Sequence, residues 1–326
     1  MKEELPKTMR AAVIDATGGP EVLQIREVAM PTPLLAEVLV RVTAAGVNPI
    51  DAKTRSGGGV SAAINNYPTI LGGDFSGIVA QSPYATHPLQ PGAPVYGMMS
   101  VPRTAGSYAE YVSVSSLSVA RRPTNLTPIE AAGVPLAAMT AWGALEQADL
   151  TAGSRVLIHA GAGGVGHFAV QFARHLGAEV VTTASAHNAD WLKSLGASEV
   201  IDYHTTRFEE VLSGMDAVID LIGNVQDNTA TRSLSVLKPG GIIVNVPTKS
   251  WQTMEEEAER AGMRCTGYRV SPDAAVLAQI TDLIEAGQVT VNIDAVYPLA
   301  QAAVAHAELE KGHTRGKIVL DVSTES

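Results

Sequence analysis

The chain has 326 residues, of which 46% are hydrophobic and 17% are charged, a balance typical of a globular protein with a large core and not of a disordered one. Acidic residues outnumber basic ones by 33 to 23 and give a formal net charge of −10, which argues against nucleic acid or an anionic membrane as the main partner. The single cysteine, Cys265, excludes an internal disulfide and a multi-thiolate zinc site.

The chain starts with MKEELPKTM, a polar stretch without a charged-then-apolar signal pattern. No apolar run reaches the length of about 18 residues that spans a bilayer. We therefore expect a soluble, cytoplasmic protein that holds any anionic ligand with helix N-termini, backbone N–H groups and a few placed cations.

Short β-like runs follow one another through the first third of the chain. They are separated by Gly- and Pro-rich turns such as TGGPE and QPGAP. The runs are RAAVID (10–15), VLQIREV (22–28), EVLVRVTAAGV (37–47) and SGIVAQS (76–82). This pattern predicts a compact, barrel-like β unit that ends near residues 120–128.

The pattern changes after Pro128, where Ala- and Leu-rich segments at helical spacing begin. Thr127 followed by Pro128 predicts a helix start. From RVLIHA (155–160) to KPGGIIVNV (238–246), strand-like runs alternate with amphipathic segments, which is typical of a parallel sheet flanked by helices. Two more helical segments and a last strand, GKIVLDV (316–322), close the chain.

A glycine-rich run, HAGAGGVGHFAVQFARHLGA (159–178), separates a buried strand pattern from a helix pattern. Glycine costs about 0.5–1 kcal/mol relative to alanine inside a regular element, so the cluster needs a reason. Gly161-x-Gly163-x-x-Gly166 between strand and helix is the dinucleotide-binding pattern, in which a pyrophosphate approaches the helix N-terminus. A Cβ at Gly163 or Gly164 would hold that phosphate away. The alternative is a structural tight turn.

The residues that follow the next strand indicate which nucleotide is used. A site for NAD usually has an acidic residue about 20 residues after the first glycine, bound to the ribose 2′-hydroxyl. Here no carboxylate appears until Asp190, which favours NADP over NAD. The candidate donors to a 2′-phosphate are Ser185, His187, Asn188 and Tyr203. Neither Arg nor Lys, the stronger clamps for phosphate, lies in that turn, and an ordinary polar loop is the alternative.

Several motifs along the chain occur together in one known family. They are AAGVNPIDAKTRSG, LGGDFSGIV, GSYAEYV, AAGVPLAAMTAWGAL, AGAGGVG, LKPGGIIV and TRGKIVL. With them the sequence resembles the zinc-independent quinone oxidoreductase (zeta-crystallin-like) branch of the medium-chain dehydrogenase/reductase superfamily. The resemblance implies an α/β fold, with a GroES-like β-barrel catalytic domain formed by residues 1–125 and 269–326 and a Rossmann NADP-binding domain, a doubly wound parallel sheet, formed by residues 126–268. It also implies a homodimer.

The zinc ligands of the metal-dependent relatives are replaced in this sequence. Those relatives carry a catalytic cysteine where this chain has Asn48, and a histidine in a Gly-His-Glu motif where it reads Gly72-Gly73-Asp74. Their four-cysteine structural loop is absent. Asparagine and glycine cannot take the place of these ligands, so we expect no metal site.

The resemblance assigns two residues to catalysis. Asn48 matches an asparagine beside the nicotinamide and the substrate, and Lys53 stands where some plant enone reductases carry lysine and bacterial relatives carry tyrosine. Both are candidates to stabilise negative charge on the substrate oxygen. The alternatives are that Asn48 shapes a turn before Pro49 and that Lys53 is a solvated surface lysine.

The cofactor contacts follow from the glycine pattern and the polar loop after the next strand together with the resemblance. These are Asn48, Thr140, Gly161, Gly163, Gly164, Val165, Ser185, His187, Asn188, Tyr203, Ile222, Val246 and Arg315. Thr140 has the alternative of bonding its own helix backbone, and Ile222 and Val246 that of plain core residues. Close relatives often carry arginine at His187, so its replacement weakens the case for NADP.

These observations predict an NADPH-dependent oxidoreductase that transfers hydride to a quinone or an α,β-unsaturated carbonyl compound (an enone or enal) without zinc. The alternative is a non-catalytic NADPH-binding protein with a structural or sensory role, as the crystallin-like members suggest. The expected partner is a small-molecule substrate, with no nucleic acid and no membrane.

Overall fold

The protein consists of two compact units in a computed structural model that describes residues 5–100 and 106–323. Unit 1 runs to Leu136 and includes Ser271–Gly287 and the chain from Val291 onward, whereas unit 2 comprises Ala137–Val270 with Gln288–Thr290. The boundaries predicted after residues 125 and 268 differ from this division. Residues 126–136 belong to unit 1 because α2 (Pro128–Ala132) packs on its strands.

Unit 1 is built on a seven-stranded sheet with the order β15-β16-β3-β5-β6-β8, in which β7 also pairs with β3, and on a three-stranded sheet, β2-β1-β4. The strands are β1 (Thr8–Ile14), β2 (Gln24–Ala29), β3 (Glu37–Val47), β4 (Thr69–Ile70), β5 (Asp74–Gln81), β6 (Pro94–Met98), β7 (Tyr111–Ser115), β8 (Val119–Arg121), β15 (Ile293–Pro298) and β16 (Lys317–Asp321). Its other helices are α1 (Pro49–Arg55), α9 (Ala274–Glu285) and α10 (Ala302–Glu310).

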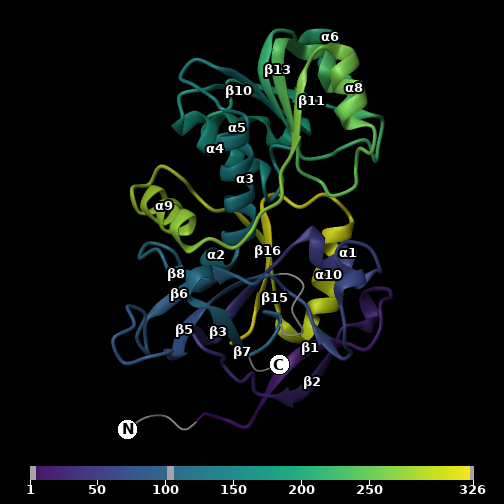
Figure 1. Cartoon of the computed structure of the whole chain (residues 1–326). Coiled ribbons are helices and arrows are strands. Elements are labelled where there is room, and N and C mark those ends of the chain that lie inside the picture. The colour runs from purple at the N-terminus through teal and green to yellow at the C-terminus, as the bar shows by residue number, and fades with distance from the viewer. Residues whose placement is uncertain (1–4, 101–105, 324–326) are drawn as a thin grey trace. The chain divides into compact units, whose positions relative to one another are not determined.

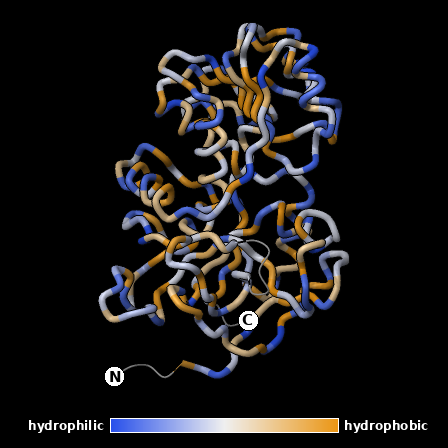
Figure 2. Tube along the Cα trace, in the orientation of Figure 1, coloured by the Kyte–Doolittle hydropathy of each residue, from blue (hydrophilic) through white to orange (hydrophobic). Residues whose placement is uncertain are grey.

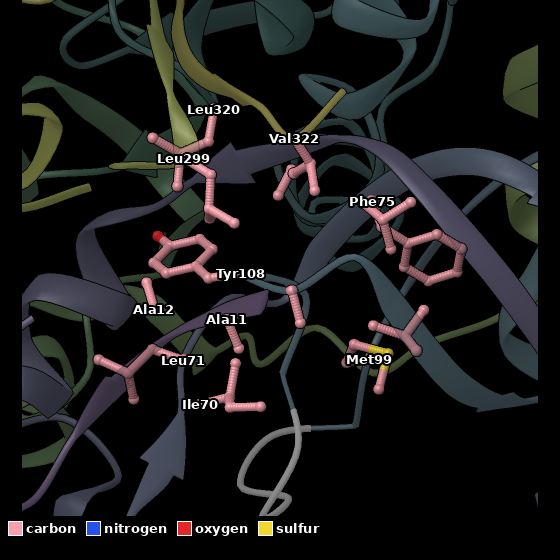
Figure 3. Close-up of a cluster of buried hydrophobic side chains, with 14 of the residues drawn as sticks. Ala11, Ala12, Ile70, Leu71, Phe75, Met99, Tyr108, Leu299, Leu320 and Val322 are labelled. Atoms are coloured by element: carbon pink, nitrogen blue, oxygen red, sulfur yellow. The ribbon is translucent and has the colours of Figure 1, made fainter. Parts of the chain in front are cut away.

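The core of unit 1 joins residues from both ends of the chain. In Figure 3 the ring of Tyr108 lies among Leu299, Ala12 and Leu71, all of them buried. A smaller apolar cluster joins Ala132 of α2 to β3 and β16. The antiparallel pairing of β16 with β3 places Ile318 opposite Val47, so the last strand brings the residues around 317 next to the start of α1.

Unit 2 contains a six-stranded parallel sheet with the order β11-β10-β9-β12-β13-β14. The strands are β9 (Arg155–Ile158), β10 (Glu179–Ala184), β11 (Glu199–Asp202), β12 (Met215–Asp220), β13 (Leu237–Asn245) and β14 (Arg264–Gly267). The helices are α3 (Pro135–Gln147), which starts in unit 1, α4 (Gly166–His175), α5 (Ala189–Leu195), α6 (Phe208–Val211), α7 (Thr229–Ser233) and α8 (Met254–Ala261).

Helices cover both faces of this sheet: α4 and α5 lie on one side of it in Figure 1, and α6 and α8 on the other. The strands are largely hydrophobic, as Figure 2 shows, because both faces are buried. The strand order reverses between β9 and β12, and in such sheets ligands bind outside the carboxyl ends of the strands at this point. The predicted α/β class with a doubly wound parallel sheet is confirmed.

Within residues 5–100 and 106–323, no helix combines the length and the apolar composition needed to cross a membrane.

Candidate functional site

The glycine-rich turn connects β9 to α4 at the carboxyl edge of the unit 2 sheet, and two of its glycines are required by packing. A Cβ on Gly161 would lie 2.1 Å from Oγ1 of Thr182, and a Cβ on Gly166 would lie 2.2 Å from the carbonyl oxygen of Ala160. At these two positions the structural explanation of the turn holds, because Gly161 lies against the neighbouring strand β10 and Gly166 lies against Ala160 just after β9, too closely for a side chain.

Gly163 is different. A Cβ there would meet the Ala160 carbonyl oxygen at 3.3 Å and no other atom within 4 Å, and its φ lies outside the left-handed region. Neither backbone conformation nor close packing therefore requires glycine. The N-cap of α4, Val165, has no side-chain cap hydrogen bond. The N–H of His167 donates to the Gly163 carbonyl at 3.1 Å, and the remaining N–H groups and the dipole at this helix N-terminus favour an anion. Together with Gly164 in the same turn, this arrangement fits a pyrophosphate.

Polar side chains meet where β10 and β11 end. The hydroxyl of Ser185 donates to that of Tyr203 at 3.1 Å and lies 3.3 Å from Nε2 of His204. Tyr203 is 54% exposed and His187 and His204 are also exposed, so these groups are accessible to a ligand. His204 was missed from the sequence, where only its position next to Tyr203 points to it.

The other two polar candidates in this loop differ in environment. His187 is exposed, whereas Asn188 is buried and its Nδ2 lies 3.2 Å from Nε2 of His187. Asn188 therefore lies beneath the loop next to His187, while Ser185 is half-buried and Tyr203 and His204 are exposed.

The loops after β12 and β13 are held by one buried carboxylate, Asp220. Its Oδ1 accepts from the backbone N–H groups of Ile222 at 3.0 Å and Gly223 at 2.8 Å, and its Oδ2 accepts from the side-chain amide of Asn245 at 2.6 Å. The Asp220 carbonyl accepts from the N–H of Val246 at 3.0 Å. Ile222 and Val246 are half-buried and are fixed at the same edge as the glycine turn.

Thr140 and His159 lie inside unit 2. Thr140 is buried on α3. His159, directly after β9, is also buried, and its ring nitrogens lie 3.1 Å from Oγ1 of Thr183 and 2.8 Å from Oγ of Ser233. Burial lowers the pKa of His159 to about 4, so it is a neutral core histidine with both nitrogens hydrogen-bonded.

Unit 1 contains a buried polar cluster formed by Asn48, Asp74 and Lys317, which are 1%, 0% and 3% exposed. Asn48 is the N-cap of α1, Asp74 begins β5, and Lys317 begins β16. The side-chain amide of Asn48 donates to Oδ2 of Asp74 at 2.9 Å, and the backbone N–H of Leu136 donates to the other Asp74 oxygen at 2.9 Å. The Lys317 ammonium donates to Oδ1 of Asn48 and, at 3.1 Å, to the carbonyl of Val47.

A second buried carboxyl extends this cluster. Oδ2 of Asp51 accepts from the backbone N–H of Asn48 at 2.9 Å and from the hydroxyl of Tyr108 at 3.1 Å, and this hydroxyl lies 3.1 Å from Nε2 of His306. Burial raises the pKa of Asp51 to about 7 and that of Asp74 to about 6, although the nearby ammonium of Lys317 lowers both. Tyr108 is fully buried here, and its hydroxyl connects Asp51 with His306.

Lys53 and Arg315 lie elsewhere in unit 1. Lys53 is exposed on α1, whereas Asn48 is buried at the start of that helix, so the two predicted catalytic side chains occupy different environments. Arg315 directly precedes β16, and its carbonyl accepts from the side-chain amide of Asn292 at 2.6 Å.

The residues at the former zinc-ligand positions do not fit a metal. Asn48 and Asp74 bind each other, and the ammonium of Lys317 lies 3.9 Å from Oδ2 of Asp74, where it would repel a cation. In the part of the chain that the structure describes, no group of three or more His, Cys, Asp or Glu side chains is arranged to hold a metal ion.

Comparisons with known proteins identify the family of the chain. Family profiles described as "Alcohol dehydrogenase GroES-like domain" and "Zinc-binding dehydrogenase" match residues 35–124 and 195–320. The chloroplastic NADPH-dependent alkenal/one oxidoreductase of Arabidopsis thaliana is 33% identical over 97% of this chain and 80% of its own length.

Solved structures of similar proteins match this chain over almost its full length. The quinone oxidoreductase from Coxiella burnetii is 38% identical with a TM-score of 0.91, covering 97% of this chain and 100% of that one. A mycobacterial protein solved in complex with NADPH is 30% identical with a TM-score of 0.83, covering 96% and 99%. With asparagine and glycine at the ligand positions of the metal-dependent members, the chain belongs to the zinc-independent quinone oxidoreductase branch of the medium-chain dehydrogenase/reductase superfamily.

Proposed function

We propose that this protein is an NADPH-dependent reductase of quinones or α,β-unsaturated carbonyl compounds. The observation that carries the proposal is the space at Gly163, which the chain's own packing leaves open and which a pyrophosphate at the N-terminus of α4 would use. The similarity to an alkenal/one oxidoreductase and to a quinone oxidoreductase supports the substrate class.

Unit 2 supplies the nucleotide site. Gly161, Gly163, Gly164 and Val165 hold the pyrophosphate, and Ile222 and Val246 line the nicotinamide end, with Thr140 as a further contact. Arg315, predicted as a cofactor contact, belongs to unit 1. Asp220 fixes the backbone of both lining loops, so their positions are set before the cofactor binds.

The 2′-phosphate is bound by Ser185, Tyr203 and His204, with His187 at the border of this group. The Ser185 hydroxyl lies within 3.3 Å of both the Tyr203 hydroxyl and Nε2 of His204, so the three groups can donate to one phosphate, whose charge strengthens such hydrogen bonds. The absence of a carboxylate between Ser185 and Asp190 removes repulsion. Together these features favour NADPH over NADH.

Asn48 and Lys53 act on the substrate. When bound, NADPH supplies the hydride. The substrate oxygen then gains negative charge, which the amide N–H of Asn48 and the ammonium of Lys53 stabilise. Asn48 is held rigidly by its bonds to Asp74 and Lys317, so its dipole needs little reorganisation, and solvent supplies the proton.

The test is a titration of the purified protein with NADPH and NADH by calorimetry, followed by NADPH oxidation with a panel of quinones, enones and enals. We expect tighter binding of NADPH and turnover with at least one class. Absence of heat with both coenzymes contradicts nucleotide binding. Tight binding without turnover across the panel would support the non-catalytic alternative, which the similarity to named oxidoreductases does not favour.

We further propose that the protein works in the cytoplasm as a homodimer. Among the described residues, β14 is an edge strand of the unit 2 sheet, and in this proposal its outer edge pairs with the same strand of a second copy, in the way exposed strand edges associate. Sedimentation at several concentrations and cell fractionation test these two statements, and a monomer at micromolar concentration or recovery in an organelle would contradict them.

A further inference from the structure

Lys317 is a buried cation in the fold of unit 1 that no step of the proposed reaction uses directly. It is 3% exposed, and it reaches Asn48 through the pairing of β16 with β3, across 269 residues of sequence. Removing an ammonium group from water costs several kcal/mol unless partners compensate. Here the partners are the Val47 carbonyl, the amide oxygen of Asn48 and the carboxylate of Asp74.

The chemistry of these partners allows only one orientation of the Asn48 amide. An ammonium group can only donate hydrogen bonds, and an ionised carboxylate can only accept them. Oδ1 of Asn48 therefore faces Lys317, and Nδ2 faces Asp74. A flipped amide would place its NH2 group against the ammonium and its oxygen against the carboxylate, two repulsive contacts in a buried site.

In this orientation the side-chain amide of Asn48 has one N–H group beyond the one that it donates to Asp74. The amide nitrogen carries two hydrogens, and the bond to Asp74 uses one of them. The ammonium at Oδ1 draws electron density toward the oxygen and makes the N–H groups stronger donors, as in other polarised hydrogen-bond chains. The remaining N–H is the one that the proposed function gives to the substrate oxygen.

We propose that Lys317 is a positioning residue for the reaction, which fixes the amide of Asn48 as a hydrogen-bond donor to the substrate oxygen. This inference rests on the proposed function. Lys317 touches neither substrate nor cofactor in it and acts only through Asn48, so its contribution disappears when Asn48 is absent.

The titratable groups that act on Lys317 are the carboxyls of Asp74 from β5 and Asp51 from α1. The ammonium lowers the pKa of the Asp74 carboxyl against the effect of burial. Without it the pKa of Asp74 rises further, and the carboxyl protonates at higher pH. This gives a readout in the protein without cofactor: the stability lost by Lys317→Met should be greater at pH 8 than at pH 5.

The decisive experiment is a double-mutant cycle with Lys317→Met, Asn48→Ala and the double variant, each measured for kcat, KM and NADPH affinity. We expect Lys317→Met to lower kcat about 10- to 100-fold, in the range for loss of an oxyanion donor, with NADPH affinity within about twofold. In the Asn48→Ala background it should have almost no further effect on kcat. Lys311→Met is the matched control, since Lys311 is exposed and pairs with Glu308, and it should behave as wild type.

Lys317→Gln replaces Lys317→Met in the cycle if the latter does not fold, because it keeps a donor to Asn48 without the charge. Lys317→Arg should recover part of kcat, since it restores a cationic donor. Additive losses in kcat, or a wild-type kcat for Lys317→Met, overturn the inference while wild-type turnover still supports the proposed function. A wild-type protein that turns over no substrate overturns both.

Discussion

The two kinds of glycine in the nucleotide turn give opposite predictions for the same substitution. At Gly166 a Cβ would lie 2.2 Å from the Ala160 carbonyl oxygen and 2.7 Å from the Cα of Gly161, both backbone atoms that cannot turn away. Gly166→Ala must therefore shift α4 against β9, at a cost of about 1–3 kcal/mol in the free energy of unfolding.

At Gly163 the added Cβ meets one backbone oxygen at 3.3 Å, which a shift of a few tenths of an ångström relieves. We expect Gly163→Ala to change the free energy of unfolding by less than about 1 kcal/mol. The methyl group occupies the space assigned to the pyrophosphate, so we expect NADPH affinity to fall about 100-fold, or about 2.7 kcal/mol.

Both variants are measured by denaturant unfolding without cofactor and by calorimetric titration with NADPH. Gly153→Ala is a control of the backbone alone, since Gly153 has a φ of 84° and no atom within 4 Å of its Cβ position; it should lose stability but keep its NADPH affinity. Wild-type affinity in Gly163→Ala would refute the reasoning, because it would mean that the open space at this turn is not where the nucleotide lies.

Three further predictions follow from single side chains. Burial raises the pKa of Asp51 from 3.8 to about 7. Between these values the folded protein binds more protons than the unfolded chain, so its stability falls as the pH rises. The free energy of unfolding of Asp51→Asn, measured by urea unfolding, should therefore gain up to about 3 kcal/mol relative to wild type between pH 5 and 8. His204→Gln should weaken NADPH binding about 5- to 10-fold and leave NADH binding unchanged, since it removes one charge-assisted hydrogen bond to the 2′-phosphate, as calorimetry can measure. Lys53→Met should lower kcat about tenfold with unchanged NADPH affinity, because its ammonium acts on the substrate oxygen, as steady-state kinetics can measure.

Each of these has a control and a contradicting result. Tyr108→Phe is the control for Asp51→Asn, because it removes the hydroxyl that donates to the Asp51 carboxyl. A stability difference between Asp51→Asn and wild type that is independent of pH would contradict a neutral carboxyl in the folded state. His313→Gln, at another exposed histidine, should not change NADPH binding, and an equal loss of NADPH and NADH affinity in His204→Gln would place His204 away from the 2′-phosphate. Unchanged kcat in Lys53→Met would leave Lys53 a surface lysine.

Much of unit 2 could be predicted from the sequence because its pattern is local. A parallel sheet with covered faces requires nearly continuous apolar strands. RVLIHA and the later strand-like runs as far as KPGGIIVNV have this composition. The glycine spacing identified the turn, since strand, turn and helix follow one another within about 20 residues. The missing carboxylate after β10 and the replaced zinc ligands were also visible from single positions.

The arrangement of the buried cluster was decided only by the tertiary structure. No local pattern connects Asn48 with Lys317, because they meet through the pairing of β3 with β16, and Asp74 joins them from β5. The family resemblance predicted Asn48 as a residue beside the nicotinamide and the substrate, while its burial and fixed amide depend on these distant neighbours. The boundary after residue 136 has the same cause, since Ala132 packs against strands that come from both ends of the chain. The sequence alone thus determined the elements and the chemistry available at each position, and long-range strand pairing determined which of these groups share one site.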